Sequence, residues 1–181
     1  MSSQTRALHA VALISLLALP GVALSQDIPG WYLGFGIGQS TFKGTCCDDT
    51  DTAGKILGGY QFSRNFDLEG AYVDLGQAKA GNVTFGATGF EGTGVGMLPL
   101  GGGFSALARG GLFIWKTELK APGASTDATG TDLTYGLGLK FDFNRDFSGR
   151  VEWQRYKDVG DVNKTGQSDI DFVGVSLMYR L

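Results

Sequence analysis

The sequence predicts an all-β fold, an eight-stranded antiparallel up-and-down β-barrel that spans a membrane, and three observations support this prediction. Apolar residues alternate with small or polar ones over most of residues 26–181, which is typical of strands with two different faces. Short and long connections alternate between the predicted strands. The chain also has 30 glycines and 12% aromatic residues but only 18% charged residues, against about 25% charged in an average soluble domain. This composition suits apolar outer faces, aromatic rims and a crowded interior.

Residues 1–25 have the pattern of a cleaved signal peptide. Arg6 supplies the positive start, residues 10–19 are mostly apolar, and the small residues Ala23 and Ser25 stand at the −3 and −1 positions of a cleavage site. The alternative is an anchoring helix, but this apolar stretch is shorter than the roughly 20 residues that span a bilayer. We therefore expect cleavage after Ser25, export, and a single barrel domain over residues 26–181.

Eight runs of alternating residues are the predicted strands: Trp31–Phe42, Thr52–Phe62, Phe66–Leu75, Val83–Leu98, Phe104–Lys116, Asp132–Phe143, Phe147–Lys157 and Ser168–Leu181. Short turns join the second run to the third, the fourth to the fifth, and the sixth to the seventh. Longer connections lie near residues 43–51, 76–82, 117–131 and 158–167. Short turns at one end and long loops at the other are typical of outer-membrane barrels, whose turns face the periplasm.

The chemistry of the two strand faces distinguishes a membrane barrel from a soluble one. A soluble β-sandwich or lipocalin-like barrel would bury its apolar face. Here the polar face is rich in Gly, Ser and Thr, so we expect ionic and small side chains in the lumen, and Leu133, Leu137 and Val175 against lipid. Aromatic residues gather at the predicted turn-side strand ends, as in the girdle of a membrane barrel: Trp31, Tyr60, Phe62, Phe66, Phe104, Phe141, Phe143, Phe147 and Tyr179.

Several segments resemble the OmpA-like family of outer-membrane β-barrels, over essentially all of residues 26–181. They are Gly58–Phe62 with Asn65-Phe66, Leu68–Tyr72, Ala108–Gly111, Gly149–Gln154 and Gly174–Leu181. The resemblance implies an integral outer-membrane protein of the bacterial cell envelope that periplasmic chaperones and the barrel-assembly machinery insert. Two features depart from the family. The last residue is Leu181 where members usually end in Phe, which that machinery reads, and no peptidoglycan-binding domain follows the barrel.

The alternation places five charged residues on inward faces: Glu69, Arg109, Lys140, Arg150 and Glu152. Lys55 is expected to join them, and Glu91 is a further candidate. A Lys or Arg on the lipid face near mid-membrane costs about 2–4 kcal/mol, whereas charges in the lumen can pair with one another. In the resembled family the positions of Glu69, Arg109, Arg150 and Glu152 form an interior network. That of Lys140 is acidic there, so we expect a different pairing here.

The predicted interior network has two interpretations, an ion gate or a polar plug. Eight strands leave a lumen only wide enough for side chains, which favours the plug.

Two further groups of residues are candidates for contacts outside the barrel wall. Arg155 and Lys157 lie at the outer end of the seventh predicted strand, where they could contact the phosphates of lipopolysaccharide or be ordinary rim cations. Cys46-Cys47 lies in the first long loop beside three aspartates. After export the two cysteines could form a strained ring, pair with another chain or stay free. We expect no metal site there, because adjacent cysteines are poorly spaced as ligands.

The sequence predicts a structural or surface-interaction protein that is not an enzyme. The only histidine is His9, inside the predicted signal peptide, so no Ser-His or Cys-His pair is available in residues 26–181. No helix follows the Gly-rich stretches, no cofactor motif is present, and a net charge of −3 does not favour nucleic-acid binding. We expect a monomer whose loops meet an unknown extracellular ligand. A small ion-conducting channel and a lipid-A-modifying enzyme are the alternatives.

Overall fold

A computed structural model describes residues 29–43, 48–80, 83–121, 124–161 and 167–181. The predicted signal peptide of residues 1–25 and the Cys46-Cys47 pair lie outside the described residues. Within these ranges, no helix has the length and hydropathy needed to cross a membrane.

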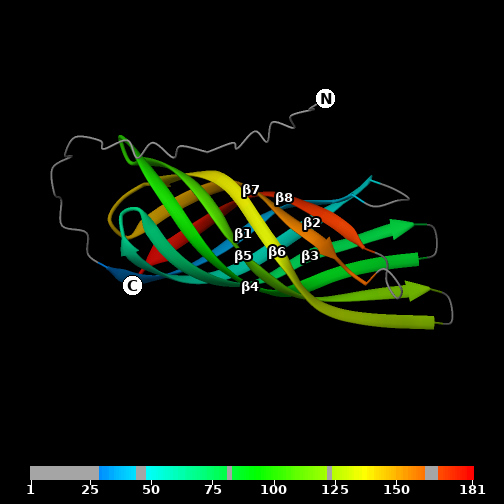
Figure 1. Cartoon of the computed structure of the whole chain (residues 1–181). Coiled ribbons are helices and arrows are strands. Elements are labelled where there is room, and N and C mark those ends of the chain that lie inside the picture. Colours follow the sequence, from blue (N-terminus) through cyan, green and yellow to red (C-terminus); the bar gives the residue numbers. More distant parts are fainter. Residues whose placement is uncertain (1–28, 44–47, 81–82, 122–123, 162–166) are drawn as a thin grey trace, which may run out of the picture.

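The described chain forms eight antiparallel strands in a closed barrel, which confirms the predicted fold class. Each strand pairs with the next one in sequence, and β8 closes the ring against β1 (Figure 1). The strands are β1 (Gly30–Lys43), β2 (Asp48–Ser63), β3 (Phe66–Ala80), β4 (Val83–Gly101), β5 (Phe104–Ala121), β6 (Ala124–Asp142), β7 (Phe147–Val159) and β8 (Ser168–Arg180).

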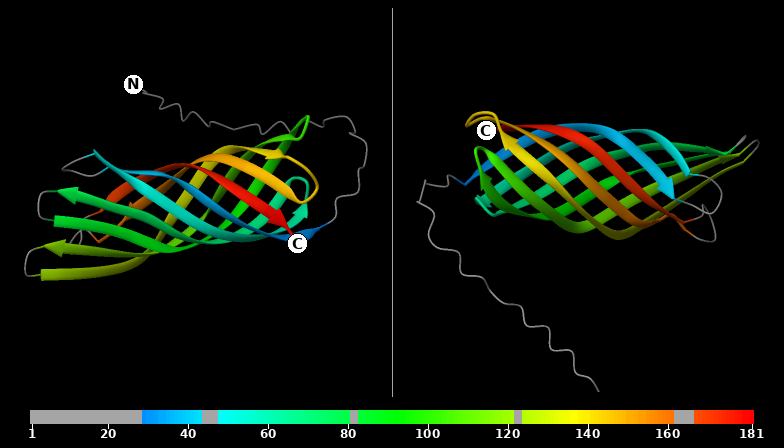
Figure 2. Two further views of the ribbon diagram at one scale, coloured as in Figure 1. Left: turned by 180° about the vertical axis from the view of Figure 1, so that it is seen from behind. Right: turned by 90° about the horizontal axis from the view of Figure 1, so that it is seen from above.

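Three tight turns close one end of the barrel, and the C-terminus lies at the same end (Figure 2). The β4–β5 turn needs glycine, because Gly101, Gly102 and Gly103 all have positive φ. In the β6–β7 turn, the side-chain oxygen of Asn144 accepts hydrogen bonds from the N–H groups of Asp146 and Phe147, at 2.9 and 2.8 Å. These turns form the end that we call the turn end; the opposite end is the loop end.

Two of the long connections at the loop end consist mostly of strand, so the predicted loop over residues 117–131 is wrong. β5 continues to Ala121 and β6 begins at Ala124, and the two remain paired throughout. β3 and β4 likewise extend through most of the predicted loop at residues 76–82. The loop-end parts of β3, β4, β5 and β6 therefore form a four-stranded sheet that projects beyond the rest of the barrel (Figure 1). We call it the projecting sheet.

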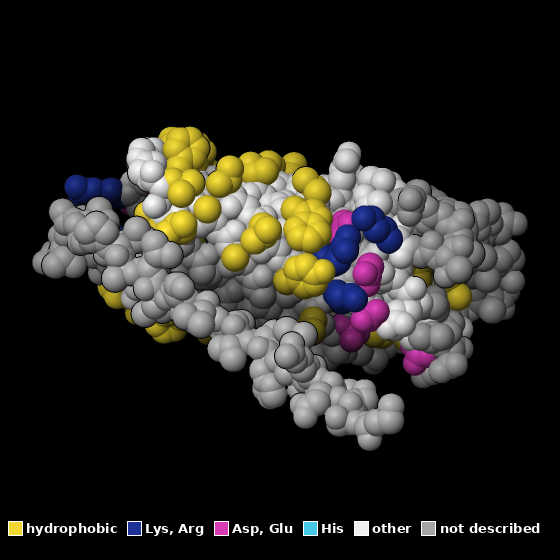
Figure 3. Space-filling view, turned by 45° about the horizontal axis from the view of Figure 1, so that its top comes forward, with side chains coloured by type: hydrophobic (Ala, Val, Ile, Leu, Met, Phe, Trp, Pro, Cys, Tyr) yellow, Lys and Arg dark blue, Asp and Glu magenta, His cyan; other side chains and the backbone are white. Residues whose placement is uncertain are grey.

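The wall of the barrel is apolar outside, as predicted. Leu133, Leu137 and Val175 are 62%, 60% and 52% exposed, whereas Arg150 and Glu152 are buried. Hydrophobic side chains cover much of the barrel surface in Figure 3. Apolar exposure on this scale is unfavourable in water and suits a lipid environment. At the turn end the predicted aromatic girdle forms ring contacts, among them Trp31–Tyr60, Tyr60–Phe62, Phe104–Phe141 and Phe147–Tyr179.

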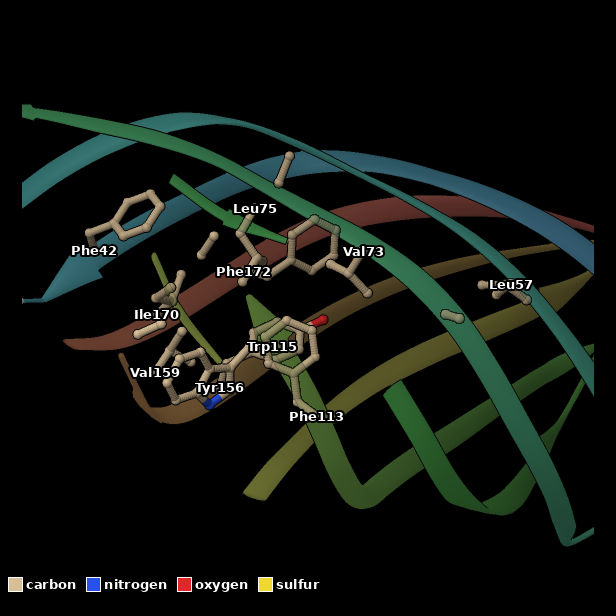
Figure 4. Packing of buried hydrophobic residues seen from close by; sticks show 14 of the residues in the cluster. Phe42, Leu57, Val73, Leu75, Phe113, Trp115, Tyr156, Val159, Ile170 and Phe172 are labelled. Atoms are coloured by element: carbon tan, nitrogen blue, oxygen red, sulfur yellow. The ribbon is translucent and has the colours of Figure 1, made fainter. Parts of the chain in front are cut away.

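The lumen differs from the prediction in its loop-end half, which large apolar side chains fill. Phe113, Trp115, Tyr156 and Phe172 pack there with smaller residues (Figure 4), and the rings of Phe113 and Tyr156 are 4.6 Å apart. Inward glycines make room for these rings, since a Cβ on Gly89 would lie within 3 Å of Phe113. The expectation that only ionic and small side chains fill the lumen is therefore wrong for this half. We call the group Phe113, Trp115, Tyr156 and Phe172 the aromatic layer.

Candidate functional site

Six buried charged side chains form one connected group in the lumen, on the turn-end side of the aromatic layer. They come from five strands, because every second residue of a strand faces inward, and they comprise three cations and three anions: Lys55, Arg109, Arg150, Glu69, Glu91 and Glu152. We call this group the central network. Each of these side chains has an opposite charge within 4.0 Å.

Arg109 on β5 is the centre of the network. Its guanidinium nitrogens lie 3.1 Å from Glu69, 2.9 Å from Glu91 and 3.0 Å from Glu152, on three other strands. It also donates a hydrogen bond of 2.8 Å to Thr93. The guanidinium presents five donors in a rigid planar fork, so one Arg can bind several carboxylates at once in fixed directions. Arg109 thus ties opposite sides of the barrel together.

Arg150 and Lys55 complete the balance of charge. Arg150 donates to both oxygens of Glu69, at 2.6 and 3.1 Å, and Glu69 also accepts a hydrogen bond of 2.6 Å from the Tyr32 hydroxyl. The Lys55 ammonium lies 2.5 Å from Glu152 and 4.7 Å from the centre of the Phe172 ring. Lys55 therefore lies where the central network meets the aromatic layer.

Gln154 and Tyr156 connect the central network to the strands around it. The Gln154 amide donates to Glu91 and Thr134, at 2.7 and 2.8 Å, and accepts from Lys55 at 3.0 Å. The Tyr156 hydroxyl donates to Glu91 at 3.0 Å. Sequence analysis did not single out these two residues or Tyr32. The signal was present, because Gln154 and Tyr156 have the same inward parity as Arg150 and Glu152 on β7.

Lys140 faces inward but lies outside the central network. It pairs at 2.8 Å with Asp142, two residues further along β6. Both residues line a small cavity that opens at the turn end, together with charged residues that include Arg145, Asp146 and Arg180. The structure thus groups Glu69, Arg109, Arg150 and Glu152, adds Lys55 and Glu91, and separates Lys140.

A second charged group lies on the outer wall at the loop end. Arg155 forms a two-pronged ion pair with Asp171, at 2.6 and 2.7 Å, and rests over the ring of Trp153. Lys43 approaches the same carboxylate at 2.8 Å. Lys157 lies 3.9 Å from Asp158 and is more exposed than Arg155. Charged side chains border the hydrophobic surface on one face of the molecule in Figure 3. The two predicted rim cations therefore already have carboxylate partners.

The described residues contain no group of three or more His, Cys, Asp and Glu side chains arranged to hold a metal ion. In the central network, the Lys and Arg side chains pair with carboxylates of the same chain, so the network needs no added ion to balance its charge.

Comparisons with known proteins agree with the fold of the barrel. Among solved structures, the chain is similar to Neisserial surface protein A, with a TM-score of 0.74 and 9% identity over 86% of this chain and all of that one. It is also similar to Ail of Yersinia pestis in complex with the heparin analogue sucrose octasulfate, with a TM-score of 0.61 and 15% identity over 84% of this chain and 99% of that one. The N-terminal β-barrel domain of Pseudomonas aeruginosa OprF gives 0.58 and 14%, over 84% and 98%.

At these identities the solved structures show a shared fold. The search of curated proteins gave no match. The family model described as the outer membrane protein beta-barrel domain matches residues 9–180, nearly the whole chain. Together with the closed barrel, its apolar wall and its charged lumen, this match shows that the chain belongs to the outer-membrane β-barrel family and is an integral protein of the bacterial outer membrane.

Proposed function

We propose that this protein is a closed barrel whose loop end is an interaction surface at the outside of the cell, and that it neither conducts ions nor catalyses a reaction. One observation carries the proposal: the projecting sheet extends from a barrel whose lumen is filled by the central network and the aromatic layer. The wall anchors the protein, the filled lumen stabilises it, and the projecting sheet offers a surface to partners.

The composition of the loop end favours cationic partners over anionic ones. The segments 43–53, 74–88, 116–132 and 157–171 contain six Lys and eleven Asp or Glu, a net charge of −5. The similar barrel of Ail holds a heparin analogue, a polyanion. A polyanion would meet net repulsion here, so we do not extend that ligand to this chain.

Lipopolysaccharide is the lipid partner that we propose for the outer wall. Lys43 and Lys157 are more exposed than Arg155, whose guanidinium is held by Asp171. They are therefore the better candidates for phosphate contacts than Arg155. We also propose that residues 1–25 are removed on export and that the barrel-assembly machinery inserts the rest.

A small channel is the second candidate, and one observation favours it. Asp67 Oδ1 and Arg150 Nε are buried near the turn-end cavity and have no hydrogen-bond partner among the described residues. Water entering from the turn end would satisfy both atoms. For ions to pass, this water would have to continue through the aromatic layer to the loop end.

Two measurements test the proposed function. Single-channel recording on the refolded protein is expected to show no current, and regular current steps would support the channel instead. Surface labelling uses a chain with Cys46 and Cys47 replaced by Ser and with Ser125→Cys in the projecting sheet. A membrane-impermeant maleimide is expected to label intact cells that carry it. The control Arg145→Cys, in the β6–β7 turn, should react only after the outer membrane is opened. Labelling of Arg145→Cys alone in intact cells would invert the proposed orientation.

A further inference from the structure

One edge of the projecting sheet is an unpaired strand. β6 pairs with β5 from Ala124 to Phe141, but its pairing with β7 ends at Thr134 opposite Tyr156. The first ten residues of β6, Ala124–Leu133, therefore have no partner strand on their other side among the described residues. We call this stretch the β6 edge.

The path of β7 explains the open edge. A bulge follows Tyr156, and Asp158 and Gly160 have positive φ values of 53° and 111°. Past the bulge, Val159 pairs with Ser168 of β8 and is fully buried over the lumen. The N–H of Asp158 donates to Asp169 of β8 at 3.0 Å. β7 therefore turns towards β8, and among the described residues no strand pairs with this side of Ala124–Leu133.

The hydrogen-bonding direction of each backbone group in the β6 edge follows from the next part of β6, which pairs with β7. Thr134 donates through its hydroxyl to the Arg155 carbonyl at 3.1 Å, so that carbonyl faces β6. In antiparallel pairs, opposite residues either exchange both hydrogen bonds or face away from each other, so Tyr135, opposite Arg155, faces β7. Successive residues of a strand point their N–H and C=O groups to opposite sides, and no bulge interrupts this alternation along β6. The N–H and C=O groups without a partner strand among the described residues are thus those of Ser125, Asp127, Thr129, Thr131 and Leu133.

The opposite edge of the projecting sheet, formed by β3, is protected against pairing with a further strand, unlike the β6 edge. On β3, a bulge and the positive φ of Gly76 end the pairing with β2. The Asp51 carboxylate then accepts the free N–H of Gln77 at 2.7 Å. Natural edge strands usually carry such protection, or Lys, Pro or a bulge. The β6 edge has none of these, and its Thr residues favour an extended strand.

We propose that the β6 edge binds an extended, cationic peptide segment of a partner protein by adding it to the projecting sheet as a further strand. The proposal rests on the proposed function, in which this end meets the outside of the cell. Main-chain hydrogen bonds to the odd-numbered residues supply affinity. Charge sets the preference, because Asp127 and Asp132 are the only charged residues of the β6 edge and the surrounding loop end is net acidic.

Peptide binding in detergent micelles tests the edge without depending on orientation in the cell. The probe is a fluorescent nine-residue peptide of alternating Lys and Val. Thr129→Pro with Thr131→Pro removes two free N–H groups while sparing the pairing with β5, and is expected to weaken binding at least tenfold. The matched control, Thr129→Val with Thr131→Val, keeps both N–H groups and should bind within twofold of wild type. Equal binding by the proline variant would overturn the proposal.

Backbone hydrogen exchange on the wild-type protein gives a second readout that needs no variant. Without peptide, the amides of residues 127, 129, 131 and 133 should exchange quickly, whereas the even-numbered amides bonded to β5 should be protected. The Lys-Val peptide is expected to protect the odd-numbered amides. The same peptide with alternate N-methyl groups, or with Glu in place of Lys, should not.

Two outcomes would replace the proposed occupant. Odd-numbered amides that are already protected without peptide would mean that another part of this chain covers the edge. A dimer that the proline variant dissolves would mean that a second copy does. Surface labelling that fails while peptide binding succeeds would reject the proposed function and leave the edge intact as a peptide site.

Discussion

Arg109 is the residue on which the lumen depends most. Its guanidinium serves Glu69, Glu91 and Glu152 in a space where all four side chains are fully buried. Removing one partner of a buried ion pair typically costs about 3–5 kcal/mol, because the other charge stays buried without compensation. We predict that Arg109→Met lowers the free energy of unfolding by at least this amount, measured by urea titration in lipid vesicles with tryptophan fluorescence.

The control for Arg109→Met is Lys116→Met on the outer face of the same strand. Lys116 lies 3.3 Å from Asp127, but both side chains are more than half exposed, so the loss should stay below about 1 kcal/mol. Adding Glu91→Gln to Arg109→Met restores the balance of two cations and two anions. The double variant should therefore be more stable than the sum of the two single losses predicts. Strictly additive losses would show that the charges do not act as one network.

Asp171 holds Arg155 and approaches Lys43 outside the barrel wall, and this contact yields a second prediction. Asp171→Asn removes the negative charge from the pair while keeping the size of the side chain. Because the group is partly exposed, we expect a stability change below about 1 kcal/mol. The freed cations should raise affinity for vesicles containing lipopolysaccharide, measured against neutral phosphatidylcholine vesicles. Unchanged lipopolysaccharide affinity would argue against both Arg155 and Lys43 as lipid contacts.

The inward position of charged residues could be predicted from sequence, but their partners could not. Period-two alternation predicts which face of a strand a residue occupies, and Arg109, Arg150 and Glu152 are buried in the lumen as this pattern requires. Partners depend on the register between strands, which alternation does not reveal. Lys140 shows the consequence: it lies directly opposite Arg150 across β6 and β7, and like charges in that position repel. Lys140 pairs instead with Asp142 at the turn end.

At the scale of the strand, sequence patterns located all eight strands but ended several of them too early. Residues 124–131 are Ala, Ser, Thr, Gly and Asp, a composition shared by loops and by exposed strands. Hairpin pairing with β5, which composition does not reveal, makes this segment a strand. Alternation does not predict the aromatic layer, for a different reason. Phe113 and Trp115 share the inward parity of Arg109, but this parity does not tell whether rings or polar side chains fill a given level of the lumen.

The bend of β7 at Asp158 gives a prediction at the same scale. Asp158 has a φ of 53°, a conformation that costs a non-glycine residue about 1 kcal/mol. Asp158→Gly should therefore raise the free energy of unfolding by about 0.5–1 kcal/mol, and Asp158→Val should lower it by more than that. Asp127→Gly, within regular β6, should instead lower the free energy of unfolding by about 0.5–1 kcal/mol. Urea titration in lipid vesicles measures all three. A loss of stability in Asp158→Gly would show that the bend is not strained.

For the whole molecule, the central network and the aromatic layer obstruct the lumen one after the other. A path through the barrel must pass both, so opening one should not be enough for conduction. We predict no current from Arg109→Ala, whose aromatic layer is intact, and none from Phe113→Ala with Phe172→Ala, whose central network is intact. The triple variant should conduct, measured by single-channel recording on protein that still shows heat-modifiable gel migration. Leu112→Ala, on the lipid face beside Phe113, controls for loss of bulk, and together with Arg109→Ala it should give no current. Current from Arg109→Ala alone would mean that the aromatic layer is no barrier and that the charges by themselves keep the barrel closed.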